Sequence, residues 1–164
     1  PIVPVAARVT GFEVKAAYRY QDVQADYIHA GGDLIRLSKP FLNKDRVLVN
    51  LAYSTPYEIW KYDLTWQWNG SRRIPDHKLA HLHSDAIQEV TAPPFSTVYG
   101  QVTRQFKKWE MYLGVENLFN FTQSNPIKSA EDPFALGFDA SMVWGPITGF
   151  NTYAGMTFIL KHKK

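Results

Sequence analysis

Apolar and polar residues alternate along six stretches of the chain, and this alternation restricts the possible folds more than any other feature. In residues 58–69, for example, Trp60 and Leu64 occupy even positions, whereas Lys61 and Asp63 occupy odd ones. Successive side chains of a β-strand point to opposite faces, so each stretch predicts a strand with one apolar and one polar face. The six predicted strands are residues 10–21, 46–54, 58–69, 97–106, 109–117 and 152–160.

These predicted strands are long. Each has 9 to 12 residues, whereas strands in globular proteins usually have about 5–6. A β-strand that crosses a lipid bilayer at a tilt needs about 9–11 residues. The lengths therefore favour strands that span a membrane.

Short and long connections alternate strictly between the predicted strands. The short ones are residues 55–57 and 107–108, and the long ones are residues 22–45, 70–96 and 118–151. In an antiparallel sheet this order places every long loop at one end, as in outer-membrane barrels with long extracellular loops and short periplasmic turns. The sequence therefore predicts an all-β fold, an antiparallel up-and-down transmembrane β-barrel segment.

Tryptophan positions agree with this interpretation. Trp60 and Trp68 lie eight residues apart on one face, about 20 Å along the membrane normal at a tilt of ~40°. Barrels of this kind carry an apolar band ~25 Å tall between two aromatic girdles. We therefore predict that Trp60, Trp68 and Trp109 are girdle residues. The alternative is a β-sandwich whose tryptophans fill a protein core.

Composition excludes several other classes. With 45% hydrophobic and 15% aromatic residues and no cysteine, the chain is neither disordered nor a disulfide-stapled module. No run of about 18 apolar residues predicts a transmembrane helix. The net charge of +3 is concentrated near the end, at residues 161–164. The chain has no basic stripe for nucleic acid, so we expect no such partner.

Six strands are too few to close a barrel, which needs about eight or more. Either another chain covers the two open edges, or this sequence is the terminal portion of a larger barrel. The chain begins at Pro1 without a methionine or leader, and we expect the second arrangement.

The end of the chain resembles a known family. Residues 98–120, and within them the segment GVENLFN at 114–120, are similar to the penultimate hairpin of TonB-dependent outer-membrane receptors. Residues 123–127 and 138–146 are similar to the Bacteroidetes branch of that family. The similarity covers nearly the whole chain and is weakest in residues 1–9 and 70–96.

The last predicted strand resembles the signal that the barrel assembly machinery reads at the end of outer-membrane barrels. Its pattern is polar-x-Gly-x-x-aromatic-x-apolar, and Tyr153, Gly155, Phe158 and Leu160 match it. The chain departs from the family in the extension at residues 161–164, because family members more often stop near the last apolar residue.

The resemblance implies energy-coupled import across the outer membrane. Residues 1–164 would form the C-terminal part of the barrel, with the N-terminal plug and its TonB contact outside this chain. Implied partners are outer-membrane lipid, the rest of the barrel and plug, TonB through that plug, the barrel assembly machinery, and a scarce extracellular ligand. That ligand would be a siderophore, metal, vitamin or oligosaccharide.

Two groups of residues are candidates for ligand binding. His77, His81 and His83 lie close together in one long loop, and neutral imidazoles bind copper, nickel or zinc. A solvated loop explains the same residues, because no closed ligand set is present. Arg72 and Arg73 follow a predicted strand, where guanidinium groups suit a siderophore or phosphate. Lipopolysaccharide phosphates are an alternative partner for them.

No motif indicates catalysis. The chain has no Gly-x-Ser-x-Gly, phosphate loop, dinucleotide fingerprint or His-Glu-x-x-His. We therefore expect a non-enzyme without a cofactor. The competing hypothesis is a secreted β-sandwich module that binds carbohydrate on its aromatic residues.

Overall fold

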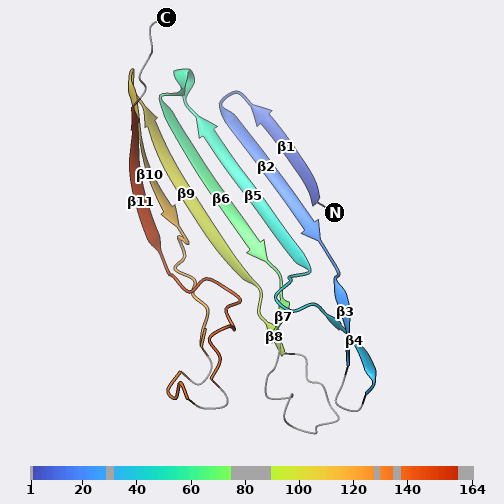
Figure 1. Cartoon of the computed structure of the whole chain (residues 1–164). Helices are drawn as coiled ribbons and strands as arrows, with labels where there is room; N and C mark the ends of the chain where they lie inside the picture. Colours follow the sequence, from blue (N-terminus) through green and yellow to red (C-terminus); the bar gives the residue numbers. More distant parts are fainter. Residues whose placement is uncertain (1, 29–31, 75–89, 128–129, 135–137, 159–164) are drawn as a thin grey trace, which may run out of the picture.

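The computed structural model shows an all-β chain whose main element is one seven-stranded antiparallel sheet (Figure 1). The structure describes residues 2–28, 32–74, 90–127, 130–134 and 138–158. The strand order is β1-β2-β5-β6-β9-β10-β11. Its strands are β1 (Ile2–Val9), β2 (Phe12–Tyr20), β5 (Asp45–Ser54), β6 (Trp60–Asn69), β9 (Phe95–Gln105), β10 (Trp109–Glu116) and β11 (Asn151–Phe158).

Three short connections lie together at one end of this sheet, which we call the turn end (Figure 1). Between β1 and β2, Gly11 has a φ of 77°, and the Ser54 carbonyl oxygen would lie 2.6 Å from an added Cβ, so only glycine fits. Between β5 and β6 the short 3-10 turn η1 (Pro56–Glu58) reverses the chain. Residues 106–108 join β9 to β10.

The long connections leave the opposite, loop end of the sheet (Figure 1). One contains the two-stranded ribbon of β3 (Gln24–Ile28) and β4 (Leu34–Ser38). The next contains the ribbon of β7 (Arg72–Ile74) and β8 (Val90–Ala92). The third joins β10 to β11 through residues 117–150. The three long connections therefore all leave the sheet at the end opposite the short turns.

The predicted number of six strands was wrong. The described residues form eleven strands, of which seven belong to the main sheet. Residues 2–9 form β1, and the stretch predicted as 10–21 begins at Phe12 because Thr10 and Gly11 form the turn. Residues 22–45 and 70–96, predicted as loops, contain the two ribbons. The sheet is also open, since β1 and β11 each have one unpaired edge among the described residues.

The register gives each strand of the main sheet one apolar and one polar face, except β1, which is apolar at nearly every position. Cross-strand rows such as Leu51–Leu64–Gly100 continue the apolar face from strand to strand. Among the described residues, the buried apolar side chains are few: Ala92, Val98 and Met142. The sheet therefore has no hydrophobic core of its own. None of the described helical segments is long and apolar enough to cross a membrane.

Candidate membrane surface and loop-end site

The apolar face extends over all seven strands and is open to the surroundings. Val5 on β1 is 63% exposed, Leu113 on β10 is 60% and Met156 on β11 is 64%. Patches of this kind mark surfaces that contact a partner or a membrane. In the described part of the chain, no second sheet packs against this face, so the β-sandwich alternative gains no support.

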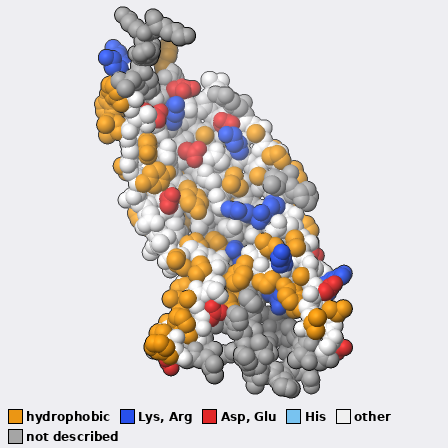
Figure 2. Space-filling view, viewed as in Figure 1, with side chains coloured by type: hydrophobic (Ala, Val, Ile, Leu, Met, Phe, Trp, Pro, Cys, Tyr) orange, Lys and Arg blue, Asp and Glu red, His pale blue; other side chains and the backbone are white. Residues whose placement is uncertain are grey.

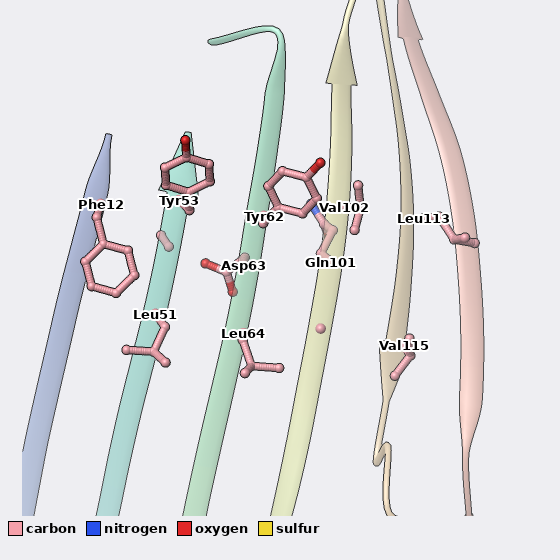
Figure 3. Close-up of a pocket in the computed structure, with 12 residues that line it drawn as sticks. Phe12, Leu51, Tyr53, Tyr62, Asp63, Leu64, Gln101, Val102, Leu113 and Val115 are labelled. Atoms are coloured by element: carbon pink, nitrogen blue, oxygen red, sulfur yellow. The ribbon is translucent and has the colours of Figure 1, made fainter. Parts of the chain in front are cut away.

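A shallow groove of about 420 Å³ crosses the middle of this face (Figure 3). It forms where Gly100, without a side chain, stands between the larger Leu64 and Val115 in one cross-strand row. Apolar side chains from β2, β5, β6, β9 and β10 line it. The groove is therefore a depression in an apolar surface, and it contains no cluster of polar groups.

Aromatic residues mark the turn-end border of the apolar face. The cross-strand partners of Phe12 on β2 lead through Tyr53 on β5 to Tyr62 on β6. The first aromatic residue of β6 is Trp60, which lies two positions nearer the turn end than Tyr62. In the same way, the cross-strand partners of Trp60 lead through Arg104 on β9 to Met111 on β10, and Trp109 lies two positions nearer the turn end than Met111. In both cases the aromatic position moves by two residues over a distance of two strands. The border therefore shifts by one residue per strand.

This shift gives the slope of the strands against the aromatic border. One residue of about 3.4 Å per strand spacing of about 4.8 Å corresponds to an angle of about 35°. Transmembrane barrels tilt their strands by about 35–45°. At that slope the eight residues from Trp60 to Trp68 rise about 22 Å, close to the ~25 Å height of an apolar band.

Arg104 is the one cation on the apolar face of β9, and it lies at the aromatic border. Its guanidinium carbon is 4.9 Å from the centre of the Trp60 ring and 4.8 Å from that of Phe106. The ring of Trp109 stacks on Phe106 at 3.9 Å. Arginines near the ends of apolar bands reach to the water boundary in this way.

The opposite face is polar and internally hydrogen-bonded (Figure 2). The Asn50 amide on β5 donates to the Asp63 carboxylate at 2.9 Å and to the Thr65 hydroxyl at 2.8 Å on β6. Glu13 and Lys15 on β2 form an exposed ion pair at 3.1 Å. Polar contacts of this kind, between neighbouring strands and along one strand, are compatible with a wet surface.

The last strand is locked to its neighbour by two reciprocal tyrosine–glycine pairs. Tyr153 of β11 lies over Gly114 of β10, and Tyr112 of β10 lies over Gly155 of β11. The Tyr153 hydroxyl also donates to Gln101 Oε1 at 3.0 Å. Of the predicted assembly signal, Phe158 lies on the apolar face beside Trp109, and Leu160 lies outside the described residues.

The connection after β10 is held down by two buried amide side chains that the sequence did not single out. Asn117 donates to the Phe121 carbonyl at 2.6 Å and accepts from its N–H at 3.0 Å. The Gln123 side chain donates to the Met142 carbonyl and accepts from the N–H groups of Trp144 and Gly145. The only sequence signal is an asparagine after a strand, where a positive φ (51° at Asn117) is tolerated.

The two arginines predicted to bind a ligand contact different aromatic rings. Both belong to β7, but Arg72 lies 5.2 Å over the Phe95 ring and Arg73 lies 5.2 Å over the Tyr27 ring. Arg73 also donates to the Ser38 carbonyl at 3.0 Å, which ties the β7–β8 ribbon to β4. Burial, and secondarily the charge of Arg46, lowers the pKa of Arg72. Nε and Nη2 of Arg72 are buried and make no hydrogen bond to the described residues.

The predicted histidines His77, His81 and His83 lie outside the described residues. Within the part of the chain that is described, no group of three or more His, Asp or Glu side chains is arranged to hold a metal ion. The described site is thus an exposed apolar surface on one face of the sheet, with a polar surface that carries basic groups at the loop end on the other.

Comparison with known proteins supports the fold. No family model matches the chain, and no curated protein matches it. A point mutant of the ferric enterobactin receptor from Pseudomonas aeruginosa is similar in structure, with a TM-score of 0.55 and 15% sequence identity. The similarity covers 95% of this chain and 22% of that receptor, so the chain spans about a fifth of its length. The chain has the all-β, antiparallel architecture of one part of that receptor.

Proposed function

We propose that this chain forms part of the wall of an outer-membrane β-barrel receptor that imports a scarce ligand by TonB-dependent coupling. The observation that carries the proposal is the exposed apolar face, bordered by aromatic residues that shift by one residue per strand. Hydrocarbon is the surrounding that such a face requires, because it covers the face without a second layer of protein.

The open edges of the sheet support a role as one portion of a larger barrel. Unpaired backbone groups along β1 and β11 would be costly in lipid, where no water can bind them. Further strands that pair with both edges remove this cost. We propose that residues 1–164 are the C-terminal part of such a barrel, with a plug supplied by another segment.

Import of a ligand follows from the kind of receptor proposed. Its relatives in structure include a receptor named for ferric enterobactin, and the motif at residues 114–120 resembles TonB-dependent receptors. The long connections at the loop end would face the outside and contact the ligand. We further propose that Tyr153, Gly155, Phe158 and Leu160 are read during barrel assembly, and that the chain is not an enzyme.

Site-specific labelling tests the assignment of the two faces. The chain has no cysteine, so single cysteines in place of Leu64, Leu113, Thr65 or Gln101 would each report one position. We expect an environment-sensitive maleimide dye at Leu64→Cys and Leu113→Cys to fluoresce as in hydrocarbon and to be quenched by lipid-borne spin labels. The dye at Thr65→Cys and Gln101→Cys should instead be quenched by a quencher dissolved in the water phase.

The labels would be read in the whole gene product, folded in outer-membrane vesicles. Quenching that does not alternate between neighbours such as Leu64 and Thr65 would contradict the membrane assignment. Coupling to TonB is tested separately, by comparing ligand accumulation in cells with and without TonB. Accumulation that is equal in both would contradict energy-coupled import while leaving the barrel assignment intact.

A further inference from the structure

We propose that Arg19, Arg46 and Arg72 form a binding site for a carboxylate- or phosphate-bearing anion at the loop end of the polar face. This inference deepens the proposed function and rests on it, because it assumes that the loop end is open to extracellular ligands. Figure 2 shows basic side chains over this face, including its loop-side half. Three different elements, β2, β5 and β7, bring the three arginines together.

The sheet register places two of these cations opposite each other. Arg19 on β2 is the direct cross-strand partner of Arg46 on β5, so their Cβ atoms lie about 5 Å apart on the same face. Like charges in directly opposite positions destabilise a sheet. An anion between them converts that repulsion into attraction.

Asn43 connects this pair to Arg72. Its backbone forms a bridge with Arg72, and its side-chain oxygen accepts a hydrogen bond from Arg19 Nη2 at 3.4 Å. The Asn43 side-chain amide in turn donates to the Asp45 carbonyl at 2.7 Å. Asn43 is only 8% exposed. Arg19 and Arg72 therefore both contact a buried, hydrogen-bonded polar residue, and Arg46 lies beside Arg19 by register, so part of the site is organised without a ligand.

Several guanidinium donors in this group are buried without a partner. Arg19 Nε, Arg72 Nε and Arg72 Nη2 are shielded from solvent and make no hydrogen bond to the described residues. A buried donor without a hydrogen-bond partner is destabilising, and more so when it is charged. A ligand oxygen that accepts from these groups would remove that destabilisation.

Nearby carboxylates do not neutralise the group. Asp45 belongs to the opposite face of β5 by register, and it accepts a hydrogen bond from the Tyr18 hydroxyl. Asp22 pairs with Lys44 at 3.7 Å. Within the described ranges, no ion pair joins a carboxylate to Arg19, Arg46 or Arg72.

The chemistry of guanidinium defines the class of ligand. Its planar fork matches the paired oxygens of carboxylate and phosphate. Three converging cations favour an anion with more than one charge, such as a polycarboxylate or a phosphate ester. Because the group lies on the polar face, the anion would arrive dissolved in water and not as a lipid headgroup.

Calorimetric titration of the whole gene product in detergent micelles tests the site. The probes are citrate and inorganic phosphate. We expect Arg46→Gln and Arg72→Gln each to weaken binding of at least one probe about tenfold, the loss typical of one hydrogen bond to a charged group. The matched control is Arg36→Gln on β4, which removes an exposed arginine that is paired with Asp26. It should leave binding unchanged.

Three results would overturn the inference. The first is that neither probe binds to the wild-type protein, and the second is that Arg36→Gln weakens binding as much as the two test variants do. The third is displacement of citrate by added lipopolysaccharide, because the group would then face lipid. Insertion into the outer membrane is measured in parallel by heat-modifiable gel mobility. A protein that inserts but binds no anion retains the proposed function and loses only this site.

Discussion

Replacement of Leu64 by arginine tests the membrane-facing assignment at its most sensitive point. Leu64 lies on the central strand β6, four residues from Trp60 and four from Trp68. At the 35° slope it is about 11 Å from each border, close to the middle of the apolar band. A charge at the bilayer midplane costs about 2–4 kcal/mol. Leu64→Arg should therefore lower the folding equilibrium constant about 30- to 900-fold.

Its neighbour Thr65 provides the matched control on the other face. Thr65→Arg removes the hydrogen bond from Asn50, about 0.5–1.5 kcal/mol, but places the new guanidinium near the Asp63 carboxylate, which returns part of that loss. A third variant, Phe12→Arg, puts the charge at the aromatic border, where the cost falls to about 0–1 kcal/mol. This depth dependence distinguishes lipid from a protein interior.

Urea titrations in lipid vesicles, with the folded fraction read by gel mobility, would measure all three variants. The expected order of destabilisation is Leu64→Arg first, followed by the other two at similar, small values. Equal losses for Leu64→Arg and Thr65→Arg would refute the assignment of faces. Equal losses for Leu64→Arg and Phe12→Arg would refute lipid as the surrounding.

Three further predictions concern the last hairpin, the long connection and the first ribbon. Gly114→Val should displace the Tyr153 ring and lower the free energy of unfolding by about 1 kcal/mol, the contribution of the hydrogen bond that the ring loses. In a Tyr153→Ala background, the same substitution should lower the free energy of unfolding in urea by less. Gln123→Ala should leave three backbone groups without partners, so proteases should cut residues 117–150 faster. The hydrogen bond from Arg36 holds the pKa of Asp26 below 3.8. Their ion pair should therefore be fully formed above pH 3.8 and be lost as the pH falls through the lowered pKa. In Arg36→Gln, the pKa of the Asp26 carboxyl group, measured by NMR, should return to about 3.8.

Each of these predictions has a result that contradicts it. An unchanged cost of Gly114→Val in the Tyr153→Ala background would show that the ring is not what the new side chain meets. Proteolysis equal to that of the exposed control Ser124→Ala would show that Gln123 does not hold the connection. A titration midpoint for Asp26 that ignores Arg36→Gln would show that the ion pair does not form in solution.

Alternation reveals a strand only where its two faces differ in polarity. Residues 58–69 could be predicted as a strand because tryptophans and a leucine alternate there with Lys61 and Asp63. Residues 2–9 form β1 but are apolar on nearly every position and include Pro4, which is tolerated on an edge strand and otherwise argues against a strand. The strands of the ribbons have three to five residues, too few for a period to appear.

The loop-end site depended on register, which the sequence does not contain. Arg19 and Arg46 are far apart along the chain, and only the pairing of β2 with β5 makes them neighbours. Arg72 and Arg73 are adjacent in sequence, but their side chains lie on different rings. The residue types alone indicated the class of ligand. The set of arginines that lie together could be identified only from the fold.

The slope of the strands also has a consequence for permeability. At 35°, each strand occupies about 5.9 Å of circumference, so a closed ring of 22 such strands, the number in large outer-membrane transporters, would be about 41 Å across between backbones. Side chains such as those of Lys61 and Tyr99 would narrow that opening only partly. A ring of that size would leak solutes and admit antibiotics unless another segment filled it, and the polar face described above is the surface that such a segment would contact.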